Sequence, residues 1–256
     1  MRQLARRPVD RAAVIRRWCA EFGDRHGIEV WCWFRPASGQ WELDFERIPG
    51  GPSVADVRAA IIAHRYLRTH QDAIAVATEA GAAIRWSRAM REPGAAVILD
   101  TETTDLDGYV VEVGVLDAAT GEALLDTLVN PGCPISAGAR AVHGISNADV
   151  AGAPPWAEVL PQLLTVTAGR TVLAYNAEFE AGVIARHTRR DGLGPGRLGD
   201  DGRWACLMGR RSAWELRYRR LPLGGGHRAL GDCRTAWELL CDMASGPARQ
   251  PKAMRR

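Results

Sequence analysis

The stretch Leu99-Asp100-Thr101-Glu102-Thr103-Thr104 ends the apolar run Ala95–Leu99 and places two carboxylates two residues apart. Because successive side chains of a β-strand alternate between faces, Asp100 and Glu102 project from the same side, roughly 6.5–7 Å apart along the strand. The apolar run gives no sign of a solvated face, which predicts a strand inside a sheet packed on both sides. Two like charges there repel each other and resist desolvation unless a cation joins them or one is protonated. We therefore predict a metal site at the end of this strand.

The composition is that of a globular protein, with 46% hydrophobic and 25% charged residues among 256. This length allows one large domain or two modest ones. We expect no membrane association, because no apolar run reaches the length of a membrane span and Met1–Arg7 leads into a charged stretch rather than a secretory signal. The six cysteines form no CxxC pair and no zinc-ligand spacing, so we expect reduced thiols in a cytoplasmic protein.

Charge is unevenly distributed along the chain, although the net charge is only +3. Residues 1–93 carry 15 arginines against 11 acidic residues, residues 94–243 carry 14 against 19, and residues 244–256 carry four basic residues and no acid. Basic segments flanking an acidic body would suit a polyanion whose reacting end lies at metal-binding carboxylates. Ordinary surface charge is the alternative.

Glu92-Pro93-Gly94 is the best candidate domain boundary, because the sharpest change of composition follows it. We predict an N-terminal accessory α/β module of unknown role over residues 1–93, a second domain over 94–243 and a basic disordered tail over 244–256. The expected elements of the module are helices over 10–24, 53–68 and 71–91 and a hairpin of strands 30–34 and 41–45. Four of the nine tryptophans lie within residues 18–41, and we interpret them as core, with stacking on single-stranded bases as the alternative.

Downstream of Gly94 the pattern indicates three meandering strands followed by alternating helices and strands. The expected strands are 95–102, 109–117, 122–129, 171–175 and 203–207, and the expected helices are 155–167, 177–190, 208–219 and 229–243. Such an order predicts an α/β fold in which a mixed sheet is flanked by helices.

Further acidic and imidazole side chains recur where an inward-facing metal site would need them. Asp232 lies four residues before Ala236 of the apolar stripe in the last helix, so it should face the core at the helix entrance, unless it only caps the helix. His227 follows Gly224-Gly225-Gly226, which suggests a mobile arm, although a loop histidine is commonly just solvated. Glu180 lies on the expected core face of its helix, where it could also be a first-turn acid that interacts with the helix dipole.

Three segments together resemble the exonuclease motifs of the DEDDh 3′–5′ exonucleases, the DnaQ-like enzymes of the ribonuclease H-like fold. They are Asp100-Thr101-Glu102-Thr103-Thr104, Tyr175-Asn176-Ala177-Glu178-Phe179-Glu180 and His227-Arg228-Ala229-Leu230-Gly231-Asp232. Val142-His143-Gly144-Ile145-Ser146 resembles the segment that links the first two motifs. A single D-x-E is a weak signal, whereas all motifs in this order on strand, helix and helix are a strong one. The resemblance covers residues 94–243 and implies a ribonuclease H-like mixed five-stranded sheet.

The resemblance implies phosphodiester hydrolysis with two divalent cations, Mg²⁺ or Mn²⁺, which prefer hard oxygen ligands. Asp100 would bridge both ions, Glu102 and Asp232 would hold the ion that carries the attacking water, and Glu180 would support the second ion. His227 would take the proton of the water, a role that suits an imidazole with a pKa near working pH. The same motifs imply substrate-binding residues, namely Thr103, Thr104, His143, Asn176 and Phe179.

Two residues depart from the family pattern. The second motif of the family ends in Asp where this chain has Glu180, and the longer side chain displaces the carboxylate in a site where Mg²⁺ demands good geometry. A glycine usually follows the threonine pair of the first motif, whereas this chain has Asp105, a negative charge near a phosphate. Both departures point to an altered substrate or a lower activity.

The expected substrates are single-stranded or frayed 3′ ends of DNA or RNA, and a replication or repair protein is an expected partner through residues 1–93. Ten arginines between Arg186 and Arg220 could contact phosphates or line a solvated helix face. The competing functions are an RNA-trimming enzyme, a catalytically weakened nucleic-acid-binding module, and a module that docks on a polymerase or helicase.

Overall fold

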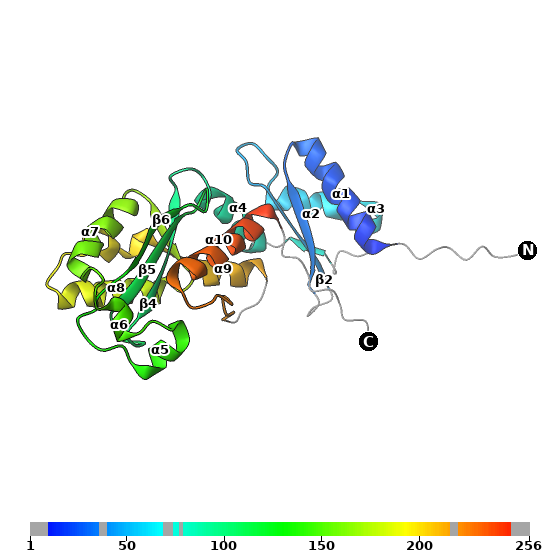
Figure 1. Ribbon diagram of the computed structural model, residues 1–256. Helices are drawn as coiled ribbons and strands as arrows, with labels where there is room; N and C mark the ends of the chain where they lie inside the picture. Colours follow the sequence, from blue (N-terminus) through cyan, green and yellow to red (C-terminus); the bar gives the residue numbers. More distant parts are fainter. Residues whose placement is uncertain (1–9, 36–39, 69–73, 77–78, 216–219, 247–256) are drawn as a thin grey trace, which may run out of the picture. The chain divides into compact units, whose positions relative to one another are not determined.

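The structure is a computed structural model that describes residues 10–35, 40–68, 74–76, 79–215 and 220–246 (Figure 1). These residues form two compact units. The N-terminal unit comprises the described residues up to 85 together with 214, 215 and 246, and the larger unit comprises 86–213 and the described part of 217–245. The domain boundary after Pro93 stays a prediction, and the tail beyond residue 246 lies outside the described residues.

The N-terminal unit contains a three-stranded sheet in the order β1-β2-β3, in which the first pair is antiparallel and the second parallel. Its elements are α1 (Arg11–His26), β1 (Val30–Arg35), β2 (Gln40–Phe45), α2 (Val54–Ala63), α3 (Arg65–Arg68), β3 (Ile74–Val76) and α4 (Glu79–Met90), which continues into the larger unit. The predicted small α/β module and its hairpin are confirmed, whereas the turn of the hairpin, residues 36–39, lies outside the described residues.

The predicted helix over 71–91 is wrong in its first part, because Ile74–Val76 is a strand that pairs with β2. This strand buries Ile74 in the same core as Leu43 and Phe45. A three-residue strand is too short to show the alternation of apolar and polar residues by which a strand is recognised.

The tryptophans of the N-terminal unit support the core interpretation. Trp18, Trp31 and Trp33 are buried. Trp214 packs against the cluster that contains Trp31 and Trp33, and its indole N–H donates to the carbonyl of Gly246 at 2.7 Å. A segment far along the sequence therefore helps to complete this unit.

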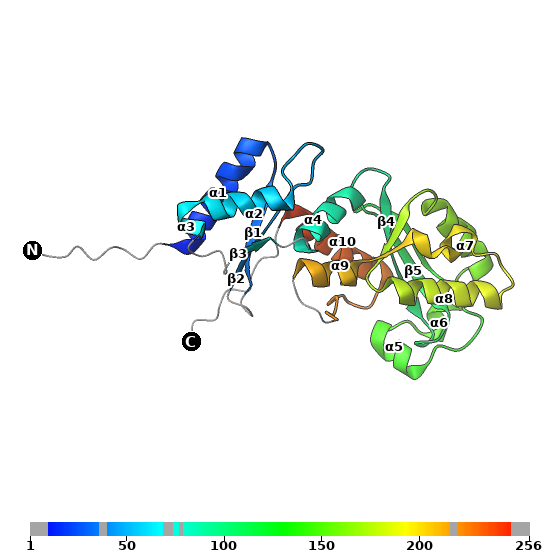
Figure 2. The same ribbon diagram turned by 180° about the vertical axis from the view of Figure 1, so that it is seen from behind.

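The larger unit contains a five-stranded sheet in the order β6-β5-β4-β7-β8, with helices on both sides (Figure 1, Figure 2). The strand β5 pairs antiparallel with both β4 and β6, and β7 and β8 run parallel to β4. Its elements are β4 (Ala96–Thr103), β5 (Val110–Asp117), β6 (Ala123–Leu128), α5 (Ala137–His143), α6 (Asn147–Val150), α7 (Trp156–Val166), β7 (Thr171–Ala174), α8 (Ala177–Arg190), η2 (Gly196–Gly199), η3 (Asp201–Arg203), β8 (Trp204–Cys206), α9 (Leu207–Trp214) and α10 (Ala229–Ser245). The predicted mixed five-stranded sheet is confirmed.

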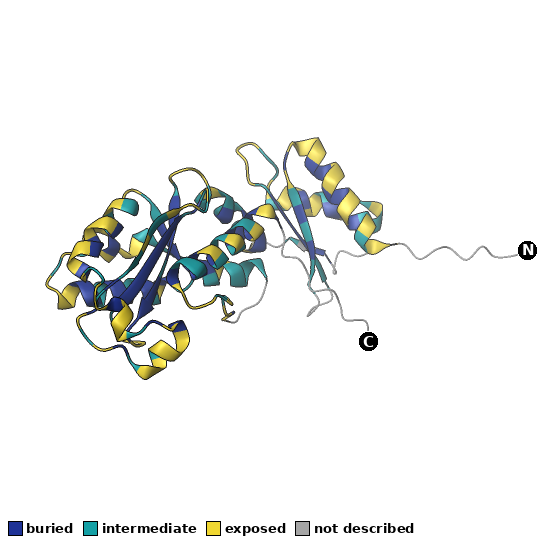
Figure 3. Cartoon of the chain, viewed as in Figure 1, coloured by how far each residue is buried: buried dark blue, intermediate teal, exposed yellow. Residues whose placement is uncertain are grey.

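The central strand β4 presents its two faces to different helices. Val97 and Leu99 are buried in the core cluster that includes residues of α7 and α8. On the other face Cys233 of α10 donates from its thiol to the carbonyls of Ile98 and Gly114. Figure 3 shows that the strands at the centre of this unit are almost entirely buried. Even-numbered residues of β4, Asp100 and Glu102 among them, therefore face α10.

Within the part of the chain that the structure describes, no helix combines the length and the apolar character needed to cross a membrane.

Candidate metal and active site

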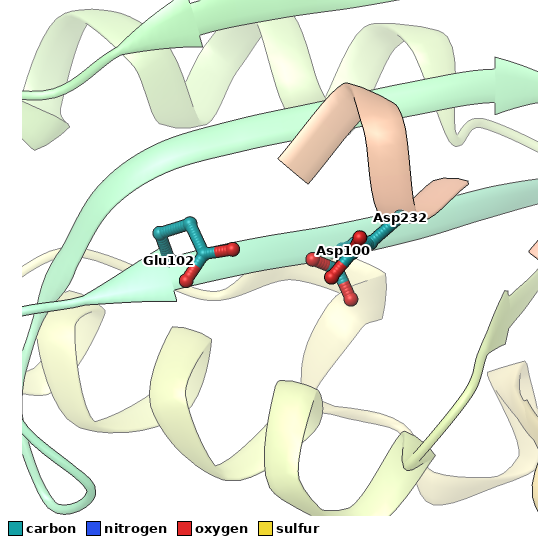
Figure 4. A group of neighbouring side chains, drawn as sticks. All are labelled: Asp100, Glu102 and Asp232. Atoms are coloured by element: carbon teal, nitrogen blue, oxygen red, sulfur yellow. The ribbon is translucent and has the colours of Figure 1, made fainter. Parts of the chain in front are cut away.

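Three carboxylates from two elements meet at the end of β4 (Figure 4). Asp100 and Glu102 come from the strand and Asp232 from the first turn of α10, and one ligand atom of each lies within 4.8 Å of the others. The apolar first half of β4 is buried and so fixes the strand that carries Asp100 and Glu102. In the same way, Ala236, Leu240 and Met243 are buried and fix the helix that carries Asp232. The convergence that the sequence predicts for these three residues is thus present in the structure.

Gly114 lets the start of α10 reach the strand. It pairs directly with Asp100 across the β4–β5 ladder, and a Cβ on this glycine would lie 2.7 Å from the backbone nitrogen of Leu230. Real Cβ atoms do not approach backbone this closely, so any larger residue at 114 would push the helix, and with it Asp232, away from Asp100. Sequence reasoning missed this glycine because its role depends on a helix more than a hundred residues away.

Asp232 supplies an acceptor that nothing in the described part of the chain satisfies. Its Oδ1 is buried without a hydrogen-bond partner there. The backbone of Gly225 passes so close that a Cβ on it would overlap this carboxylate. A buried unpaired carboxylate oxygen is costly, and a cation removes that cost. The all-oxygen donor set, the short separations and the unpaired Oδ1 fit a hard divalent cation.

Burial and mutual repulsion make two carboxyl groups of the site hard to ionise in the absence of a cation. Desolvation raises the pKa of Asp100 well above its ordinary value, and the charges of Glu180, Glu102 and Asp232 raise it further. Desolvation, with the charges of Asp232 and Glu112, raises the pKa of Glu102 to about 7, against a lowering by Arg228. Bound cations favour the ionised carboxylates, so protons and metal compete for this site.

Glu180 approaches from the other face of the strand. It is buried in the first turn of α8, and its Oε2 accepts a 2.5 Å hydrogen bond from the hydroxyl of Thr101. Desolvation raises its pKa to about 8, although the Thr101 hydrogen bond lowers it. Within the described residues the group of three mutually close carboxylates does not include Glu180. Its predicted role at a second cation stays a prediction.

His227 is exposed on the arm, which we define as residues 221–228. Its φ of 54° is the only positive value among the described non-glycine residues, a conformation that side chains with a Cβ rarely adopt. Tyr175 donates to the carbonyl of Leu221 at 2.5 Å, and Arg211 donates to the Tyr175 hydroxyl and to the carbonyl of Pro222.

The predicted substrate-binding residues of the first motif shape the loop after β4. The strand has an irregular register between Glu102 and Thr103. The hydroxyl of Thr103 donates to the carbonyl of Asp105, and that of Thr104 accepts from the backbone of Tyr109. His143 is buried; its Nδ1 accepts from the Ile145 amide, so its Nε2 carries the hydrogen and donates to the Thr103 carbonyl at 3.1 Å.

The second motif places Asn176 at the start of α8, where its side chain makes no capping hydrogen bond within the described residues. Phe179 packs against the main core cluster of the larger unit. The assignment of Asn176 and Phe179 to substrate binding stays a prediction, as does that of Thr103, Thr104 and His143.

Several arginines that sequence analysis offered as phosphate contacts already have partners. Arg186 donates to the carbonyl of Gly108, and Arg190 donates to the carbonyl of Pro131 and lies over the ring of Tyr109. Arg210 lies over the ring of Trp86. Arg217 and Arg219 lie outside the described residues. Arg186 and Arg190 therefore hold loops in place, a role that a run of basic residues does not disclose.

Comparison with known proteins identifies relatives of the larger unit. Residues 97–195 match the RNase T family model, described as exonuclease. The chain is 30% identical over 180 residues to an uncharacterized exonuclease, CP81, of Escherichia phage 186, over 59% of this chain and 89% of that protein. It is 30% identical over 163 residues to exodeoxyribonuclease 10 of Escherichia coli K12, over 57% of this chain and 67% of that protein. A solved structure of exonuclease X in complex with 5′ overhanging duplex DNA shares 30% identity at a TM-score of 0.42, over 59% of this chain and 91% of that one.

Proposed function

The chain belongs to the DnaQ-like exonuclease family with a ribonuclease H-like fold, and on that basis we propose that it removes nucleoside monophosphates from nucleic-acid 3′ ends by two-metal hydrolysis. The observation that carries this proposal is the meeting of Asp100, Glu102 and Asp232 within 4.8 Å, with a buried Oδ1 of Asp232 that no described group satisfies. Without a bound cation, burying three carboxylates together would cost folding free energy and bring no compensating interaction.

Two Mg²⁺ or Mn²⁺ ions would supply an activated water and neutralise the charge that develops on the leaving oxygen. Asp100 would hold both ions, and Glu102 and Asp232 would hold the one that carries the water. Glu180 would support the other ion from the α8 side. His227, exposed on the arm, would accept the proton of the attacking water.

The surface beside the site supports binding of a nucleobase. Leu106 is 77% exposed and Val142 is 54% exposed, so both apolar side chains are open to a ligand. Leu106 follows Asp105, whose carbonyl accepts from Thr103, and Val142 precedes His143, which donates to the same threonine. Both residues thus adjoin residues that contact Thr103 at the end of β4, and we propose that they contact the terminal base of a single-stranded or frayed 3′ end. Residues 1–93 would bind a replication or repair protein.

The direct test is a time course with 5′-labelled single- and double-stranded DNA and RNA, in Mg²⁺ and then in Mn²⁺. A 3′–5′ exonuclease yields a ladder of labelled products that shorten progressively, whereas the opposite polarity releases a labelled mononucleotide at once. Asp100→Asn should abolish cleavage while the protein keeps its circular dichroism spectrum and unfolds at a midpoint no lower than that of the wild type. Undiminished turnover by this variant would remove Asp100 from the mechanism.

A nucleic-acid-binding module with weakened catalysis is the second candidate, and the engagement of Glu180 with Thr101 favours it. Calorimetry with Mn²⁺ separates the two. Two binding sites support the enzyme, and one site or none supports the weakened module.

A further inference from the structure

A buried carboxylate, Glu112, forms an ion pair with the half-exposed Arg228 at the start of α10 and has no part in the proposed reaction. Glu112 of β5 is 3% exposed, although it carries a carboxylate. Arg228 donates from Nε to both of its oxygens at 3.1 Å and from Nη2 to Oε1 at 2.5 Å. The backbone N–H of Ala229 donates to Oε2 at 2.9 Å. All its described donors therefore come from two consecutive residues at one helix start.

This carboxylate lies beside the candidate metal site. Glu112 pairs directly with Glu102 across the β4–β5 ladder, so both side chains project from the face that α10 covers. Glu102 belongs to the group of three close carboxylates, whereas Glu112 does not. The Glu112 carboxylate instead accepts hydrogen bonds from Arg228 and from the Ala229 amide.

The helix start that Glu112 holds carries two proposed functional residues. The first N–H groups of a helix lack partners within the helix, and a carboxylate placed there satisfies one of them and interacts favourably with the helix dipole. Ala229 lies three residues before Asp232 and two after His227. His227 keeps an unfavourable positive φ, which persists only where its surroundings fix the backbone. Arg228, the next residue, is fixed by Glu112.

We propose that Glu112 is a positioning residue. Through Arg228 and the Ala229 amide it holds the start of α10, and so it sets where His227 sits relative to Asp232. This inference rests on the proposed function, in which His227 accepts a proton beside the carboxylates. Sequence reasoning did not find Glu112, although a carboxylate inside the apolar strand Val110-Val111-Glu112-Val113 is a visible signal.

The test compares Glu112→Gln and Arg228→Gln with Asp117→Asn. Asp117 ends the same strand and is a matched control, because it also pairs with an arginine, Arg170, at 2.9 Å and accepts from two backbone amides. Its pairing partner is Val97, at the other end of β4 from the carboxylates. Gln at 112 can still accept from the Ala229 amide, and Gln at 228 can still donate one hydrogen bond to Glu112. Because Arg228→Gln leaves the buried Glu112 without its cation, we expect it to be the less stable of the two variants, and circular dichroism checks that both fold.

We expect Glu112→Gln and Arg228→Gln to lower kcat about 10–100-fold with KM nearly unchanged, because a small misplacement of a reacting group costs this much. Asp117→Asn should keep kcat within about twofold of the wild-type value, because a remote ion pair acts on stability alone. This should hold even if its unfolding midpoint falls as much as those of Glu112→Gln and Arg228→Gln. In a His227→Ala background, Glu112→Gln should cost far less than alone, since groups that act together are not additive. Equal kcat values for Glu112→Gln and Asp117→Asn, or losses that multiply fully, would overturn the proposal.

Amide hydrogen exchange gives a readout that does not depend on activity. Exchange at residues 229–232 should quicken in Glu112→Gln and Arg228→Gln but not in Asp117→Asn. If exchange at residues 229–232 is the same in these variants as in the wild type, Glu112 does not fix the start of α10. If the wild-type protein cleaves no nucleic acid, the proposed function fails, and the exchange result still decides whether Glu112 positions this helix.

Discussion

The hydroxyl of Thr101 donates a 2.5 Å hydrogen bond to Oε2 of Glu180 and so joins β4 to the first turn of α8. Thr101 points away from the face that carries Asp100 and Glu102, because neighbouring strand residues alternate. Glu180 therefore reaches the site from the side opposite α10. A shorter carboxylate on the same helix would stop before this hydroxyl.

Glu180→Asp tests what the longer side chain does. We expect cleavage to rise or stay unchanged, because the family residue frees the carboxylate from Thr101. The free energy of unfolding should fall by about 1–3 kcal/mol, since a buried hydrogen bond is lost. Single-turnover cleavage and urea unfolding measure the two effects. A large loss of cleavage would mean that the site is built around the longer side chain, and Thr101→Val is the control that removes the hydrogen bond alone.

Stability of the metal-free protein should depend on pH through the carboxyl groups of the site. Burial raises the pKa of Glu102 to about 7 and that of Glu180 to about 8, and raises that of Asp100 as well. Carboxyl groups of an unfolded chain titrate near 4, so between about pH 4.5 and 8 the folded protein holds more protons and loses stability as the pH rises.

Thermal unfolding in EDTA and in Mn²⁺ measures this dependence. We expect a higher Tm at pH 5.5 than at pH 8 in EDTA, and a smaller difference with Mn²⁺, which binds the ionised carboxylates. Burial also raises the pKa of Asp44 in the N-terminal unit. Asp44 therefore contributes to the pH dependence of Tm, and Mn²⁺ should not change this contribution. Identical pH slopes with and without Mn²⁺ would contradict a metal site at these carboxylates.

Gly225 and Gly226 form a matched pair on the arm. A Cβ at 225 would overlap the carboxylate of Asp232, whereas a Cβ at 226 would meet nothing within 4 Å among the described residues. We expect Gly225→Ala to lower kcat about tenfold or more, because the arm must move away from Asp232, and Gly226→Ala to have a much smaller effect. Mn²⁺ titration of both variants shows whether Asp232 has moved too. Similar losses in the two variants would argue against this contact.

Tyr175→Phe removes the hydroxyl that fixes the base of the arm. The variant loses the hydrogen bonds to Leu221 and from Arg211, which should cost about 0.5–1.5 kcal/mol of stability. We expect kcat to fall several-fold while the core stays intact, because His227 then samples a wider range of positions. Limited proteolysis at residues 223–226 should quicken. Wild-type rates of both cleavage and proteolysis would show that this hydroxyl does not control the arm.

The sequence predicts features that depend on short-range periodicity. The alternation in β4 places Asp100 and Glu102 on one face, and the apolar stripe of α10 turns Asp232 toward them, as the structure confirms. The contacts of Glu112 with Arg228 and of Tyr175 with Leu221 join residues 116 and 46 positions apart. No periodic pattern encodes such pairs, because they depend on which elements the folded sheet brings side by side.

Trp214 has a practical consequence for anyone who wishes to isolate the N-terminal unit. Its indole fills a cluster with Trp31, Trp33 and Ile84, although it is separated from them by well over a hundred residues. A recombinant fragment cut after Pro93 would lack that ring and leave an apolar hollow open to water. Searches for a binding partner of this unit are therefore best made with the intact polypeptide as bait.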